Sequence, residues 1–218
     1  MTQSLRMALS APARRAQRGF TLIELLAVML IISILAVFLV PQVPKWIDQA
    51  NVTACRANLR EIGMGVTSYR TKYGRLPSES GVRFFAELIT AGVFENTVSA
   101  ARKLTCPGVD IGALETKDME PTEWFTDLDM LTGGYSSYAG RDCKNHPLRT
   151  LNGTHALVAD DNDPEMNHDT TTLVLMGDNT VTSHELLDLR KKGLLGPEEI
   201  LLVGPDSQIE ELRKLSLD

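Results

Sequence analysis

Acidic side chains are absent from the first 19 residues, which carry Arg6, Arg14, Arg15 and Arg18. Removing these four positive charges from the formal net charge of −6 leaves −10 on the rest of the chain. This acidic remainder argues against a broad basic surface for nucleic acid. A basic leader before an apolar stretch is the arrangement that holds the leader in the cytoplasm while the following chain is exported.

Cysteine is scarce, since the 218 residues contain only three. Three cysteines in an exported chain usually give one disulfide and one remaining thiol. Cys55 falls in a helical pattern, whereas Cys106 and Cys143 fall in the expected globular part. We therefore expect the disulfide to join Cys106 and Cys143.

Sequence motifs of an enzyme are missing. The chain contains no Gly-x-Ser-x-Gly, no cysteine and histidine paired with a clear base, and no phosphate-binding glycine loop. Its length and its 43% hydrophobic content fit one folded core with an extra element. The sequence predicts a protein that is not an enzyme.

Charged side chains are also missing from the twenty residues Leu25 to Pro44. A bilayer core of about 30 Å needs roughly 20 helical residues to cross it, so this segment can span a membrane. A secretory signal peptide would have an apolar run of roughly 7–15 residues and a small-residue cleavage site after it. Here the run is longer and ends in PQVPKW, so a plain signal anchor is the remaining simple alternative.

Glu24 is the acidic residue at the edge of this run, where a carboxylate costs about 2–3 kcal/mol unless it is paired or reaches the interface. The run RGFTLIE over residues 18–24 resembles the processing signature of type IV prepilins and type II secretion pseudopilins. The resemblance implies that prepilin peptidase cuts between Gly19 and Phe20 and that Phe20 is then N-methylated. Glu24 would pair with the new ammonium group on a neighbouring subunit.

Pro41 lies where the family commonly has a proline in its helix, and the resemblance gives it a role in assembly. A proline removes one backbone donor and can kink or loosen a helix. The simpler alternative is that Pro41 marks the end of the membrane span. Twin-arginine export through Arg14 and Arg15 is disfavoured because it does not explain Phe20 and Glu24.

One long helix is expected over residues 20–73, with a possible break near Pro41. Apolar residues recur at steps of three or four between Ile47 and Tyr73, so the second half should be amphipathic and lie against a sheet. The expected organisation is a removed leader (1–19), a membrane-spanning or filament-core half of the helix (20–44), an amphipathic half (45–73), a globular domain (74–193) and a C-terminal extension (194–218). We expect the extension to be a peripheral helix or a frayed tail.

The globular part should combine short helices with strands. Helices are predicted over Val82 to Ala91 and from Ser183 to Gly193. The best strands are His155 to Ala159 and Thr170 to Met176, and a tight turn and another strand follow the second. The predicted fold is α+β and pilin-like, with a small antiparallel sheet packed on the long helix.

A second resemblance concerns His168 and Asp178, which match the spacing of pseudopilin-like proteins that carry a histidine followed ten positions later by Asp-Gly. Asn179 replaces the glycine and still tolerates the left-handed backbone of such a turn. We expect His168 and Asp178 to brace a turn by hydrogen bonds. A zinc site is not expected, because the intervals between the histidines and the nearby acids do not match ligand spacing. The residues considered are His155, His168 and His184 with Asp160 or Asp178.

Asp160, Asp161 and Asp163 lie in an acidic run that offers oxygen ligands. The run lacks the Asp-x-Asp-x-Asp-Gly loop with a distal glutamate, so a solvated acidic turn is the favoured interpretation and Ca²⁺ the alternative. We expect no cofactor.

The sequence therefore favours a structural subunit of a type II secretion pseudopilus or a type IV pilus-like filament. The resemblance implies prepilin peptidase, other pilin subunits, an inner-membrane assembly platform and its motor ATPase as partners. It also implies a single-pass protein of the bacterial inner membrane, with a cytoplasmic leader and a periplasmic C-terminal domain. The alternative is a monomeric, membrane-anchored envelope domain that binds a ligand or metal.

Overall fold

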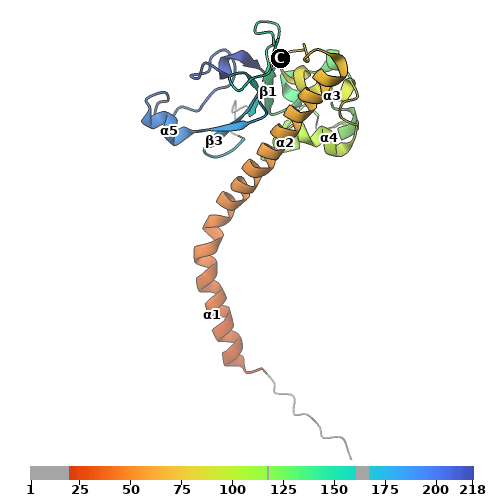
Figure 1. The fold of residues 1–218 in the computed structure, drawn as a ribbon. Coiled ribbons are helices and arrows are strands. Elements are labelled where there is room, and N and C mark those ends of the chain that lie inside the picture. The colour runs from red at the N-terminus through yellow and green to blue at the C-terminus, as the bar shows by residue number, and fades with distance from the viewer. Residues whose placement is uncertain (1–19, 117, 161–166) are drawn as a thin grey trace, which may run out of the picture. The chain divides into compact units, whose positions relative to one another are not determined.

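The structure, a computed structural model, describes residues 20–116, 118–160 and 167–218, which divide into two compact units between Val43 and Pro44. The first unit contains helix α1 (Leu22–Leu39) and a 3-10 turn, η1 (Val40–Gln42). Helix α2 (Val43–Tyr73) follows directly (Figure 1). The long helix predicted over 20–73 is confirmed from Leu22 onward. The expected break coincides with η1, where Pro41 supplies no backbone donor.

In the second unit, α2 buries one stripe of side chains and exposes the rest. The stripe consists of residues spaced by four or three positions, which is the period of one helix face. Gly74 ends the helix with a φ of 70°, and its amide donates to the Arg70 carbonyl. The buried stripe is Cys55, Leu59, Ile62, Val66 and Tyr69.

Two buried glycines beside this stripe, Gly63 and Gly65, allow close packing. A Cβ on Gly63 would lie 2.0 Å from Asn179 Oδ1, and a Cβ on Gly65 would lie 2.7 Å from Phe94 Cζ. Each glycine lowers helix stability by about 1 kcal/mol relative to alanine, but a larger side chain at either position would clash with these neighbours.

The sheet contains five antiparallel strands in the order β4-β3-β2-β1-β5. The predicted strands are confirmed as β2 (Ala156–Asp160), β3 (Thr171–Met176) and β4 (Val181–Glu185). The turn between β3 and β4 places Asn179 at a φ of 67°, as its residue type allows. Two further strands were not predicted individually: β1 (Tyr138–Arg141) and β5 (Leu215–Ser216).

Strands β1, β2 and β3 are buried on both faces of the sheet, whereas β4 is largely exposed. One face packs on the stripe of α2 and on the short helices α3 (Val82–Thr90) and α4 (Val98–Lys103), through side chains such as Leu173 and Leu175. The opposite face, with Val174 and Met176, packs on α5 (Leu186–Lys191) and the C-terminal segment. In Figure 1 the strands lie between α2 and α3 on one side and α5 on the other.

Two expectations for the C-terminal part are wrong. The helix expected from Ser183 begins at Leu186, because Ser183 to Glu185 pair with β3 as part of β4. Residues 194–218 are neither a peripheral helix nor a frayed tail, since they form a 3-10 turn and β5 and bury apolar side chains. The buried members are Leu195, Leu201, Leu212 and Leu215.

Candidate functional site

The N-terminal end of α1 is closed by a reciprocal pair of side chains. Thr21 is the N-cap, and its hydroxyl accepts from the Glu24 amide at 3.3 Å. The Glu24 carboxylate in turn accepts from the Thr21 amide at 2.9 Å and from the Thr21 hydroxyl at 2.8 Å. This arrangement is a capping box, which satisfies two otherwise unpaired backbone donors.

Glu24 keeps capacity for a further partner. Both hydrogen bonds from Thr21 go to Oε2, and no bond within the described chain goes to the second carboxylate oxygen. Phe20 lies just outside the helix and is 78% exposed. The predicted site residues Phe20 and Glu24 are therefore on the same exposed helix end, whereas Gly19 lies outside the described residues.

The remainder of α1 presents apolar side chains on every side, and none of its residues is buried within the chain. From Phe20 to Val43 the segment has 24 residues, which as a helix would extend for about 36 Å. A bilayer core is about 30 Å thick, so the segment is long and apolar enough to cross it. A helix that is apolar all round needs lipid or other apolar helices around it.

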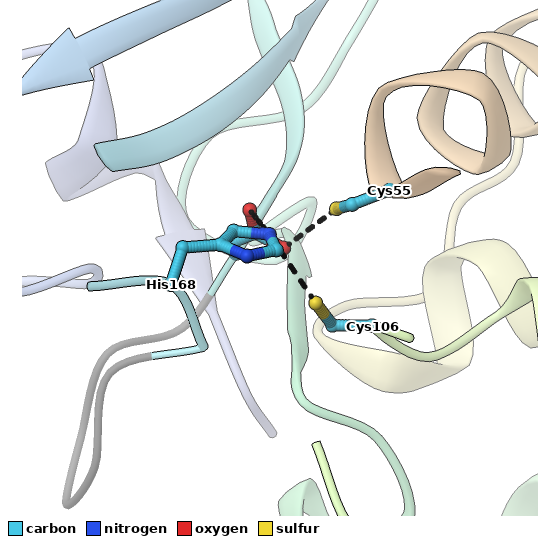
Figure 2. A group of neighbouring side chains, drawn as sticks. Cys55, Cys106 and His168 are labelled. Carbon is cyan, nitrogen blue, oxygen red and sulfur yellow. Dashed lines mark hydrogen bonds and ion pairs between the residues drawn. The ribbon is translucent and has the colours of Figure 1, made fainter. Parts of the chain in front are cut away.

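The predicted disulfide between Cys106 and Cys143 is wrong, because all three cysteines are free thiols. Cys106 follows α4 and turns toward Cys55 of α2 and His168 (Figure 2). Cys143 follows β1, and its Sγ lies 3.7 Å from the Pro77 carbonyl oxygen. The sequence could not show that the loop after α4 faces the helix rather than the β1 turn.

His168 and Asp178 have separate roles. Asp178 accepts from the amide and the hydroxyl of Thr180, so it braces the β3–β4 turn as predicted. His168 is 1% exposed and contacts Cys106, Asp160 and Asp48, so its predicted place in that turn is wrong. The histidine precedes β3, whereas Asp178 follows it, and a strand of six residues separates the two ends.

The environment of Asp160 also differs from the one expected from the sequence. Its carboxylate lies inside the core, where Oδ1 accepts from the Cys55 thiol at 3.0 Å, so it is not part of a solvated acidic turn. Asp161 and Asp163, the other residues considered for Ca²⁺, lie outside the described residues. One buried group was not predicted from the sequence, because its members are scattered over more than a hundred positions. It consists of Cys55, Cys106, Asp160 and His168.

The thiol of Cys143 should ionise only at unusually high pH. Burial raises its pKa to about 11, above the ordinary value of about 8.5. Since the thiolate is the nucleophile, labelling by iodoacetamide should keep rising about tenfold per pH unit between about pH 8.5 and pH 10. Peptide mass spectrometry without reductant measures this rate. A small free thiol is the control, because its labelling rate should level off above its ordinary pKa of about 8.5. A rate that levels off near pH 9 would contradict the prediction, and no labelling at all would indicate a disulfide.

Taken together, the fold and the N-terminal site define an α+β protein with a capped N-terminal helix that is long and apolar enough to cross a membrane. Residues 14–40 match the family model described as the prokaryotic N-terminal methylation motif. The chain is 42% identical over 65 residues to type II secretion system core protein G of Pseudomonas aeruginosa, a match that covers 30% of this chain and 46% of that protein. It is 32% identical over 92 residues to a ComG operon protein 3 homolog of Bacillus licheniformis, covering 42% of this chain and 82% of that protein.

This chain belongs to the prepilin-like family, which includes type II secretion pseudopilins. The match spans less than half of the Pseudomonas protein. No solved structure matches the chain.

Proposed function

We propose that this chain is a structural subunit of a type II secretion pseudopilus or a type IV pilus-like filament. In this proposal the leader over residues 1–19 is removed by prepilin peptidase, Phe20 is N-methylated, and the apolar helix then packs against those of other subunits. The observation that carries the proposal is the single carboxylate of Glu24 at the exposed end of an otherwise apolar helix.

Charge pairing explains why a carboxylate would be placed there. Cleavage before Phe20 creates a positive amine four residues from Glu24. When helices pack with a stagger, the amine of one subunit can lie beside the free oxygen of Glu24 in another. Removing one member of a buried ion pair typically costs about 3–5 kcal/mol, so each charge would favour the packing that supplies the other.

The same helix would hold the precursor in the membrane before assembly. A leader with four arginines and no acid favours a cytoplasmic N-terminus, so the domain that follows would be periplasmic. The partners proposed on family resemblance are prepilin peptidase, other pilin or pseudopilin subunits, an inner-membrane assembly platform and its motor ATPase. The names of the two relatives support a secretion or ComG-type assembly.

Mass spectrometry of the mature N-terminus tests this function. The expected result is a chain that begins at Phe20 and carries one methyl group on its amine. A chain that keeps Met1 and the arginines of the leader would contradict the proposal and favour a monomeric, membrane-anchored envelope domain. The same preparation from cells without prepilin peptidase is the control, in which the leader should be retained.

A further inference from the structure

Four buried side chains meet inside the second unit. Cys55 comes from α2, Cys106 from the loop after α4, Asp160 from the end of β2, and His168 from the segment before β3. Each is at most 1% exposed, and one potential ligand atom from each lies within 4.8 Å of the others. Figure 2 shows Cys55, Cys106 and His168 directed toward one another from the helix and from two separate loops.

The distances between these atoms are close to those between the ligands of a tetrahedral zinc site, although Asp160 directs one oxygen at Cys55 and the other at His168. Cys55 Sγ lies 3.0 Å from Asp160 Oδ1, and His168 Nε2 lies 3.4 Å from Cys106 Sγ and 3.5 Å from Asp160 Oδ2. Zinc bonds of about 2.0–2.3 Å at tetrahedral angles place neighbouring ligand atoms about 3.3–3.8 Å apart. Only small movements would bring all four groups into contact with one central ion.

The surrounding groups orient His168 as a metal ligand. Its Nε2 faces the cluster, whereas its Nδ1 lies 3.4 Å from Asp48 Oδ1 on the other side of the ring. Nδ1 is buried and, although Asp48 is within ion-pair distance, forms no hydrogen bond of good geometry in the described chain. A histidine that binds metal through one nitrogen usually donates its other N–H to a carboxylate, and Asp48 is placed for this role.

The other three side chains are held by bonds from nearby groups. The Gly108 amide donates to Cys106 Sγ at 3.4 Å, and the Leu173 amide donates to Asp160 Oδ2 at 3.3 Å. The Tyr138 hydroxyl lies 3.1 Å from Cys55 Sγ. Donors of this kind stabilise thiolates and a carboxylate, which are the forms that bind metal.

We propose that Cys55, Cys106, Asp160 and His168 bind one Zn²⁺ ion. Two sulfurs and an imidazole favour zinc over Ca²⁺ and Mg²⁺, which prefer oxygen ligands. Four protein ligands without an open position are typical of a structural zinc site rather than a catalytic one. The ion would fasten α2 and the loop after α4 to the sheet, and this role does not depend on filament assembly.

A disulfide between Cys55 and Cys106 is the main competitor, because an exported chain meets an oxidising compartment. Such a bond would explain the closeness of the two sulfurs alone. It would remove the hydrogen bond from the Cys55 thiol to Asp160, and it would not explain why a buried carboxylate and a buried imidazole are directed at the same point. An ion accounts for all four side chains and for Asp48.

Metal analysis of the mature protein, purified in detergent without a histidine tag or chelator, tests the proposal. We expect about one zinc per chain by elemental mass spectrometry. Cys55→Ser and Cys106→Ser should each lose most of this zinc, whereas Cys143→Ser, which removes the buried thiol outside the cluster, should keep it. Calcium or iron in place of zinc, equal loss in all three variants, or an intact mass showing a Cys55–Cys106 disulfide would overturn the proposal.

A second measurement does not depend on the folding of the cysteine variants. Wild-type protein stripped of metal and reduced should bind Co²⁺ with the near-ultraviolet absorption of cobalt–thiolate bonds. Asp48→Asn, which leaves all four ligands in place, should weaken metal binding about 10–100-fold. Asp206→Asn, a matched change on the exposed surface, should bind as the wild type does. Absence of the thiolate band, or equal affinity in Asp48→Asn and wild type, would contradict the site.

Discussion

Glu24→Gln should be processed normally yet yield at least tenfold less filament than the wild type. Glutamine can still accept from Thr21 and keep the helix cap, so the substitution removes the charge alone. The amine of Phe20 on a neighbouring subunit would then be buried without its counter-charge, at a cost of about 3–5 kcal/mol. Since about 1.4 kcal/mol corresponds to a factor of ten in association, the expected loss is large even at the lower figure.

Three controls separate charge from capping and from general effects. Thr21→Ala removes the cap and keeps the charge, so it should assemble far better than Glu24→Gln. Glu95→Ala removes an exposed acid from the second unit and should assemble as the wild type does. Glu24→Ala should still be cut and should assemble as poorly as Glu24→Gln. Immunoblots of sheared filaments measure assembly, and gel mobility measures cleavage. Wild-type amounts of filament from Glu24→Gln would contradict the pairing role.

Phe85→Ala should destabilise the second unit by about 3–5 kcal/mol, the usual cost of removing a buried phenylalanine ring. Phe85 is fully buried in α3, and its ring packs edge-on against Phe125 and Tyr138 with centroids 6.4 Å away in both cases. The substitution would open a cavity where α3 meets β1. For a domain whose total stability is typically about 5–15 kcal/mol, this is a large fraction.

Urea unfolding of the mature protein in detergent, followed by tryptophan fluorescence, measures the change. Trp124 is buried beside Phe125 and reports on this part of the core. Leu187→Ala is the control, because Leu187 is 62% exposed on α5 and should change the unfolding free energy by less than about 0.5 kcal/mol. A change below about 1 kcal/mol in Phe85→Ala would show that the surrounding rings close the cavity.

Helices α1, α2 and α3 and strands β2, β3 and β4 were predictable because each carries a local pattern. Apolar residues at steps of three or four mark the buried face of α2, and β-branched runs mark β3. The N-terminal site is likewise local, since Phe20 and Glu24 are four residues apart. These features follow from residues that are neighbours in the chain.

The missed features depend on contacts between distant segments. The short strand β5 pairs with β1 across more than seventy residues, and a two-residue strand has no period to detect. The cluster that contains Cys55, Cys106 and His168 was missed for the same reason, because the spacing of its members in the sequence matches no short ligand motif. The false disulfide arose because the sequence does not show which loop faces which helix.

The place of β5 in the sheet has a consequence for biogenesis. Strand β1 forms one of its two ladders with β2 and the other with Leu215 and Ser216, and the Leu217 carbonyl also accepts from the Val82 amide at the start of α3. The sheet therefore cannot be completed until residues 215 and 216 have been synthesised, long after the residues of the apolar helix α1.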